Sequence, residues 1–180
     1  ELRDNVRIVV REVDRVNRIV EELLALASPR KLQLSRVNLH KVLGDIITLR
    51  KRASEGKTVT FQQQFDPSIP PILADEGLLT QLFLNLIQNA IKYSADDKFL
   101  GIEVTGDVRR GRSGVLISVH DRGIGIKPED RARLTEGFFR SQDDRVRQQG
   151  GTGLGLALVK RIVEAHHGSL DIESRLVKGS

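Results

Sequence analysis

The chain has 180 residues, 39% of them hydrophobic, which suffices for one well-buried core and a short appended element. Its net charge is +5, but one Tyr, no Trp and basic residues spread along the chain provide no stacking platform for nucleic acid. No apolar run reaches the ~20 residues of a membrane span. The absence of Cys excludes disulfides and thiolate zinc sites. We therefore expect a cytoplasmic protein whose charge is ordinary solvated surface, with no nucleic-acid partner and no membrane contact from this chain.

The chain begins with an unbroken heptad pattern. Its apolar positions alternate steps of four and three residues and are Leu2, Val6, Val9, Val13, Val16, Val20, Leu23 and Ala27. This spacing is typical of a helix seam in a coiled coil or bundle, and Pro29 ends it. The opposite face is charged, so the seam needs partner helices. Packing onto the domain that follows is the alternative, but the strict heptad favours an intermolecular bundle.

Helices and strands are mixed in the rest of the chain, after a basic linker at 30–37. The expected helices are one capped by Asn38 and ended by Gly56, one capped by Asp75 and running to about Tyr93, a short polar one from Pro128, and one from about Leu154 to His166. The expected strands are Val59 to Phe65, Ile72 to Ala74, Leu100 to Arg109, Val115 to His120 after a turn at 111–114, and Leu170 to Glu173. This order predicts an α/β (α+β) two-layer sandwich, in which helices cover one face of a mixed sheet.

The helix that ends at Tyr93 carries a polar stripe. Asn85, Asn89 and Lys92 are spaced i, i+4 and i+7 and therefore share one face. Two carboxamide oxygens can bind a hard cation such as Mg²⁺, and the lysine adds a point charge for phosphates. Taken alone, an ordinary solvated helix face explains the stripe more often.

Two glycine clusters follow. The first, Asp121 to Ile126, begins where a strand ends, and its carboxylate could accept a hydrogen bond from an amino group such as that of adenine. An ordinary turn with a capping Asp is the alternative. The second, Gly150 to Leu156, leads into a helix and suits phosphate binding by backbone N–H groups. The polar stretch 140–149 before it is no strand, and a Walker lysine is absent, which disfavours the two familiar nucleotide folds.

Taken in order, these three elements resemble the N, G1 and G2 boxes of the GHKL superfamily, in the version found in sensor histidine kinases. Phe138-Phe139-Arg140 resembles the F box. The opening helix with Pro29 resembles the second helix of a histidine kinase dimerisation domain, closest to nitrogen-regulation sensors. The resemblance implies a Bergerat fold at 38–180 with ATP and Mg²⁺ as cofactors, and a partial dimerisation domain at 1–29.

The resemblance also implies roles for single residues. Asn89 is expected to bind Mg²⁺, Asp121 to read the adenine amine, and 140–150 to form a mobile ATP lid whose charged composition suits local instability. The full set of expected nucleotide-binding residues is Asn85, Asn89, Lys92, Tyr93, Asp121, Gly123, Gly125, Ile126, Arg140, Gly151, Thr152, Gly153, Leu154, Gly155 and Leu156.

The chain departs from the family pattern at several positions. Thr135 and Gly137 replace the usual F-box residues, which affects the anchoring of the lid, and Arg122 replaces a frequent Asn. The chain stops at Gly179-Ser180, where the pattern would continue into a last core strand, so we expect an unpaired sheet edge. Relatives that hydrolyse ATP carry a Glu base where Asn85 stands, and an amide cannot accept that proton.

We expect a kinase whose acceptor histidine lies outside this chain. The four histidines, His40, His120, His166 and His167, lack the context of a bundle helix with a neighbouring acid and a later Pro. The acceptor helix would precede Glu1, so this chain should bind ATP without phosphorylating itself. The partners that the resemblance implies are the protein's own dimerisation domain, as a homodimer, and the receiver domain of a response regulator. A GHKL ATPase, an anti-sigma type serine kinase and a non-catalytic scaffold are the alternatives.

Overall fold

The structure, a computed structural model, describes residues 2–27, 31–53, 59–94, 98–109 and 111–174. The helices in these residues are α1 (Leu2–Ala27), α2 (Leu39–Ala53), α3 (Glu76–Tyr93), α4 (Pro128–Arg131), α5 (Asp144–Gln148) and α6 (Gly155–Ala165). The strands are β1 (Ser35–Val37), β2 (Val59–Phe65), β3 (Ile72–Ala74), β4 (Lys98–Arg109) and β5 (Arg112–Asp121). The expected breaks at Pro29 and Gly56, and the chain end at Gly179-Ser180, lie outside the described residues.

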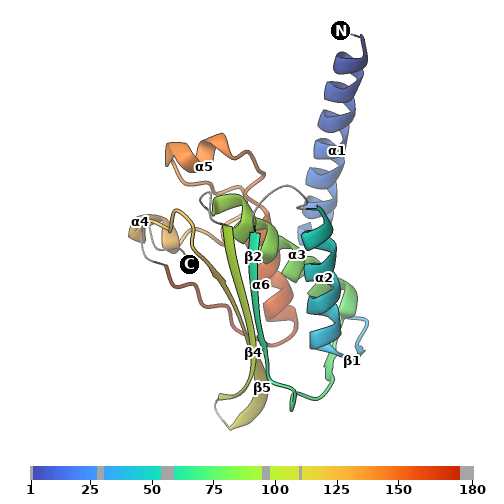
Figure 1. Ribbon diagram of the computed structural model, residues 1–180, viewed down its shortest axis with the longest axis vertical. Helices are drawn as coiled ribbons and strands as arrows, with labels where there is room; N and C mark the ends of the chain where they lie inside the picture. Colours follow the sequence, from blue (N-terminus) through green and yellow to red (C-terminus); the bar gives the residue numbers. More distant parts are fainter. Residues whose placement is uncertain (1, 28–30, 54–58, 95–97, 110, 175–180) are drawn as a thin grey trace.

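The main sheet has the strand order β2-β4-β5 and is mixed. Strand β2 runs parallel to β4, and β4 runs antiparallel to β5. The helices α2 and α3 contact one face of this sheet, and α6 packs beside α3 (Figure 1). Strands β1 and β3 form a separate antiparallel pair. The predicted two-layer sandwich, with helices on one face of a mixed sheet, is therefore confirmed.

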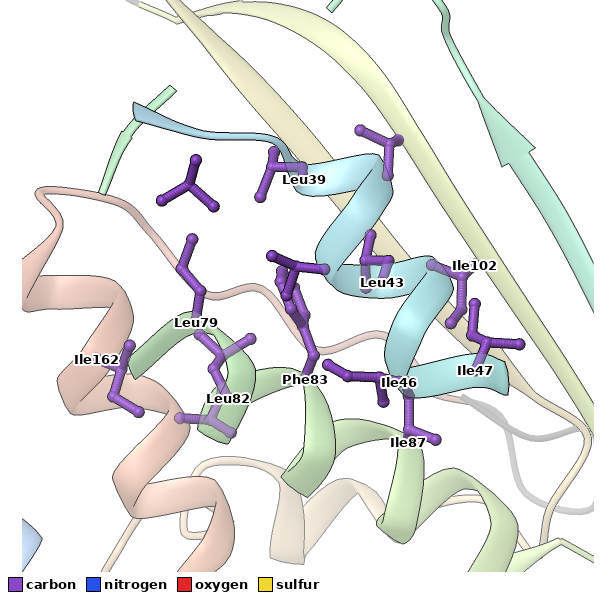
Figure 2. Close-up of a cluster of buried hydrophobic side chains, with 14 of the residues drawn as sticks. Leu39, Leu43, Ile46, Ile47, Leu79, Leu82, Phe83, Ile87, Ile102 and Ile162 are labelled. Carbon is purple, nitrogen blue, oxygen red and sulfur yellow. The ribbon is translucent and has the colours of Figure 1, made fainter. Parts of the chain in front are cut away.

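Helix α3 lies at the centre of the helical layer. The apolar face predicted for it is buried and packs with α2 and α6, as Figure 2 shows for Leu79, Leu82, Phe83 and Ile87. The sheet contributes Leu100, Ile102 and Val104 of β4, which alternate along the strand and point to the same core. Because this burial fixes the rotation of α3 about its axis, the polar stripe of the helix must face away from the sheet core.

Three segments differ from the expectation because long-range pairing decides them. Residues 35–37 of the expected linker form β1, since they pair with Ile72–Ala74. The β-hairpin turns between Arg109 and Arg112, which form a register pair, so 112–114 belong to β5 and not to the turn. The expected strand at 170–173 is absent, because in the described part of the chain β5 pairs only with β4 and no ladder reaches this segment.

The heptad helix α1 projects away from the other helices, and only its last turns lie beside α6 (Figure 1). Ala25 and Leu26 pack against the core, whereas the seam valines from Val6 to Val20 are about half exposed. Packing onto the following domain thus accounts only for the end of α1, and no described residue of the chain covers the rest of the seam. No helix in the described residues is long and apolar enough to cross a membrane.

Asp75 joins the linker to α3 through hydrogen bonds to both segments. Its carboxylate accepts hydrogen bonds from the backbone N–H of Gln33 (2.9 Å) and of Leu78 (3.1 Å). Partial burial of the carboxyl opposes ionisation, but these N–H groups outweigh it and lower the pKa. The stabilisation is therefore present above the ordinary carboxyl pKa and is lost as the pH falls through the lowered one.

We expect Asp75→Ala to lower the free energy of unfolding by about 1–2 kcal/mol at pH 7, and by less at pH 3. Urea unfolding at the two pH values measures both effects. Asp45→Ala is the matched control, because Asp45 is exposed and, among the residues that the structure describes, bonds only to Lys41, also exposed, on the same helix. Equal losses for the two variants at pH 7 would contradict the capping role.

Candidate functional site

One cleft gathers nearly all the residues expected to bind nucleotide. It lies between α3, the end of β5 and the start of α6, and it encloses about 2510 Å³ because it continues along β5 as far as Leu170 and Ile172. The expected residues that line it are Asn85, Asn89, Lys92, Tyr93, Asp121, Gly125, Ile126, Arg140, Gly151, Thr152, Gly153, Gly155 and Leu156. The roles of these side chains stay predictions, but segments far apart in the sequence do meet at this cleft.

Gly123 and Leu154 are the two expected residues that do not line the cleft. Gly123 is buried, and a Cβ atom at this position would lie 2.5 Å from the carbonyl oxygen of Tyr93. Leu154 is fully buried, and its carbonyl accepts the Leu158 N–H (2.9 Å) in the first turn of α6. Both residues support the walls of the cleft from behind.

The α3 wall approaches the first residue of α6 closely. A Cβ atom on Gly155 would lie 2.9 Å from Asn85 Oδ1 and 4.0 Å from Asn89 Nδ2. Asn85 is held by its Nδ2, which donates to the carbonyl of Gln81 (3.0 Å). The two carboxamides therefore face the amino end of α6, and only glycine fits opposite them without a shift.

The end of β5 is linked to the end of α3. The backbone N–H of Ile124 donates to the Tyr93 carbonyl (3.1 Å), and Gly123 forms a bridge with Ser94. The Gly123 N–H also donates to Asp121 Oδ1 (2.8 Å), which orients the carboxylate. Tyr93 and Asp121 therefore reach the same end of the cleft, although they are far apart in sequence.

Arg122, the departure from the family pattern, lies outside the cleft lining. Its guanidinium stacks over the Phe99 ring, 4.3 Å from the centroid. The residue is exposed, and its guanidinium lies over a side chain at the start of β4.

The second glycine cluster depends on backbone conformations that favour glycine. Gly150, Gly151 and Gly153 have φ values of +61°, +130° and +77°. The Lys92 ammonium donates to the Gly150 carbonyl. Helix α6 has no side-chain cap at its amino end, so its first N–H groups point toward the cleft without a capping side chain.

The F-box segment is anchored to this cluster through its backbone. The Phe138 N–H donates to the Gly153 carbonyl (3.1 Å), and a Cβ atom on Gly153 would lie 2.8 Å from the Phe138 carbonyl carbon. Gly137 lies against Leu154, with 3.7 Å from its Cβ position to the leucine Cδ2. The anchor therefore does not depend on the side chains that Thr135 and Gly137 replace.

The segment expected as a lid, 140–150, contains the short helix α5, which the sequence patterns did not predict. Polar side chains cap this helix at both ends. Asp143 accepts the Arg145 N–H (3.0 Å) at the start, and the Arg140 guanidinium donates to the Val146 carbonyl (2.8 Å) near the other end. Hydrogen bonds from Arg145 hold the pKa of Asp143 far below its usual range. Arg140, expected among the nucleotide-binding residues, thus caps α5 in this structure.

Side chains that the sequence patterns did not indicate hold the segment 140–150 against α4 and the residue before it. The Ser141 hydroxyl donates to Asp130, and Lys127 lies 3.7 Å from the Asp143 carboxylate. Glu22 of α1 also lines the cleft. No periodicity marks these residues, because each one acts through a partner in another element.

Comparison with known proteins identifies the family of the chain. Residues 74–180 match the family described as "Histidine kinase-, DNA gyrase B-, and HSP90-like ATPase". The chain belongs to this family. The match begins at the strand before α3, yet β1 and α2 pack in the same core, so the folded domain starts before the matched residues.

The curated relatives are sensor histidine kinases. The chain is 34% identical over 176 residues to the sensor-like histidine kinase SenX3 of Mycolicibacterium smegmatis, covering 96% of this chain and 44% of that one. It is 33% identical over 182 residues to the sensory histidine kinase/phosphatase NtrB of Azospirillum brasilense, covering 94% and 43%. The chain therefore spans less than half the length of these relatives.

Solved histidine kinases share the fold. Full-length ShkA in complex with AMPPNP has a TM-score of 0.78 at 30% identity, over 98% of this chain and 36% of that one. The mycobacterial sensor histidine kinase MprB has a TM-score of 0.60 at 28% identity, over 76% and 82%. Together with the family match, these relatives make the chain an ATP-binding catalytic domain of the sensor histidine kinase type.

Proposed function

We propose that this domain binds Mg-ATP in the cleft and transfers the γ-phosphate to a histidine on a dimerisation helix outside this chain. The observation that carries the proposal is the convergence of the two α3 carboxamides, the glycine cluster and Asp121 on one cleft. These elements supply contacts for a metal, for phosphates and for a base, respectively.

The adenine end is formed by Asp121 and its surroundings. A carboxylate accepts hydrogen bonds from an amino group, which adenine presents at C6, where guanine has a carbonyl oxygen. Gly125 has a φ of +70° and no side chain, so the backbone can approach a flat ring there. Tyr93 and Ile126 supply apolar surface beside it.

The phosphate end is formed by Lys92, 151–155 and the start of α6. An uncapped helix amino end favours anions through its N–H groups and its dipole. Lys92 Nζ also lies at this end, because a Cβ atom on Gly151 would be only 2.7 Å from it. A phosphate is a stronger acceptor than the Gly150 carbonyl that the lysine contacts now.

Asn89, with Asn85 beside it, is the assigned Mg²⁺ position. No group of three or more His, Cys, Asp or Glu able to hold a metal occurs among the residues that the structure describes. The carboxamide oxygens of Asn85 and Asn89 fit a hard cation that also takes phosphate oxygens and keeps water ligands. When bound, Mg²⁺ would neutralise phosphate charge and help to align the γ-phosphate.

Transfer is favoured over hydrolysis by the chemistry of Asn85. Its carboxamide, which faces Gly155, cannot act as a general base toward water at neutral pH. Transfer to a separate nucleophile requires mainly alignment and charge neutralisation, which the cleft provides.

The partners follow from the surface of α1 and from a structural relative. The half-exposed valine seam of α1 fits a second copy of the same helix, as in a homodimer. The histidine kinase ThkA, solved in complex with the response regulator protein TrrA, has a TM-score of 0.69 at 25% identity over 93% of this chain and 46% of that one. We infer a response-regulator receiver domain as the downstream partner.

The phosphotransfer itself is tested with γ-labelled ATP. We expect no label on this chain alone, and acid-labile label on a separately supplied dimerisation domain that carries an acceptor histidine, such as that of NtrB. Acid-stable label on a partner's serine, or steady release of inorganic phosphate as the only reaction, would contradict histidine phosphotransfer and select the serine kinase or the ATPase.

Asp121→Asn tests the adenine contact. The amide keeps the oxygen that accepts the Gly123 N–H but presents an NH₂ group to the base. We expect ATP affinity to fall about 10- to 100-fold with little change in the melting temperature, as measured by calorimetric titration. Equal affinities of the unaltered chain for ATP and GTP would refute the assigned role.

Asn89→Ala tests the metal position. We expect the gain in ATP affinity on adding Mg²⁺ to fall by about tenfold or more, since a direct oxygen ligand is removed. Gln88→Ala is the control, because Gln88 is the exposed neighbour on the same helix. An Asn89 variant whose metal dependence matches that of the control would count against the assignment.

A further inference from the structure

Helix α1 reaches the phosphate end of the cleft through one carboxylate. Thr152 Oγ1 donates a hydrogen bond to Glu22 Oε2 at 2.7 Å. Thr152 Oγ1 also accepts a hydrogen bond from the Leu154 N–H at 3.1 Å. A hydroxyl has a single proton to donate, so this contact uses the one that Thr152 has.

A second contact fixes the same part of α1. The Arg161 guanidinium of α6 donates to the carbonyl of Leu26, one helical turn after Glu22. Ala25 and Leu26 also pack against the core, while the seam before them is exposed. The last turns of α1 thus dock on α6 as a unit, and this docking places Glu22 in the lining of the cleft beside the glycine cluster.

We propose that Glu22 competes with the phosphates of ATP for the amino end of α6, so that a docked α1 lowers ATP affinity and bound ATP loosens α1. The proposal rests on the proposed function, since it places the phosphates at 151–155. In this proposal α1 has two roles: its seam packs against a second helix, and Glu22 belongs to the nucleotide site. The affinity for ATP then depends on whether α1 is docked on α6.

Electrostatics supports competition rather than shared binding. The carboxylate is bound by Thr152, three residues before the first residue of α6, whose dipole and uncapped N–H groups favour an anion. A triphosphate at the same position brings several negative charges close to that carboxylate, and like charges in a partly enclosed cleft repel. Thr152 can donate to Glu22 or to a phosphate oxygen, but not to both.

Glu22→Gln separates charge from shape, because the amide keeps an oxygen that Thr152 can donate to. We expect Mg-ATP to bind about three- to tenfold more tightly to this variant in calorimetric titrations, with a smaller dependence on salt. AMP, which lacks the β- and γ-phosphates, should bind with unchanged affinity. Glu21→Gln is the matched control, since it removes the same charge from the exposed neighbouring position of α1.

The outcomes separate this proposal from the proposed function. If the unaltered chain binds ATP and Glu22→Gln gives no gain, or Glu21→Gln gives the same gain, the competition is overturned and the proposed function stands. If neither variant nor the unaltered chain binds ATP, both are overturned. A comparable gain for AMP would also overturn the competition, because Glu22 would then act through the fold and not through the phosphates.

A measurement on the unaltered chain gives an independent test that does not depend on the folding of a variant. Coupling between two contacts is reciprocal, so ATP should weaken the docking of α1 as docking weakens ATP. We expect Mg-ATP to accelerate hydrogen exchange severalfold at the amides of 20–27, and AMP to leave it unchanged. Protection of these amides by Mg-ATP, or no change, would overturn the proposal.

Discussion

The close approach of α3 to the first residue of α6 is the contact on which the site depends. The buried face of α3, with Phe83 and Ile87 in the core, determines which way the other face points. That face carries Asn85, whose carboxamide oxygen would lie 2.9 Å from a Cβ on Gly155. Core packing and the missing side chain of one glycine thus bring amide oxygens and a helix amino end to the same cleft.

Donors in the cleft that we propose to meet the nucleotide are bound to acceptors of the protein itself. Lys92 donates to the Gly150 carbonyl, Arg140 to the Val146 carbonyl and Thr152 to Glu22. Binding a triphosphate would therefore replace these hydrogen bonds rather than fill unused sites. The free energy lost with each broken hydrogen bond offsets part of the free energy gained from the new one. The segment 140–150, expected as a lid, is held by polar contacts and none of the residues of α5 is buried, so we expect its opening to cost little.

Much of the fold and of the site could be predicted where the signal is local. The caps at Asn38 and Asp75, the apolar face of α3 and the glycine cluster before α6 are each contained in a few consecutive residues, and the structure has them as expected. The nucleotide-binding set came from a family resemblance, and all of it except Gly123 and Leu154 lines one cleft.

The sequence by itself determined the described helices except α5, the apolar faces of these helices and the residue types available for binding, because periodicity and capping act within one or two turns. Only the tertiary structure decided that 35–37 form a strand, that 170–173 do not, that Arg140 caps α5, and that Glu22 meets Thr152. Each of these outcomes depends on a partner in another element, and no local pattern specifies which distant backbone group or side chain the folded chain will bring within hydrogen-bond reach.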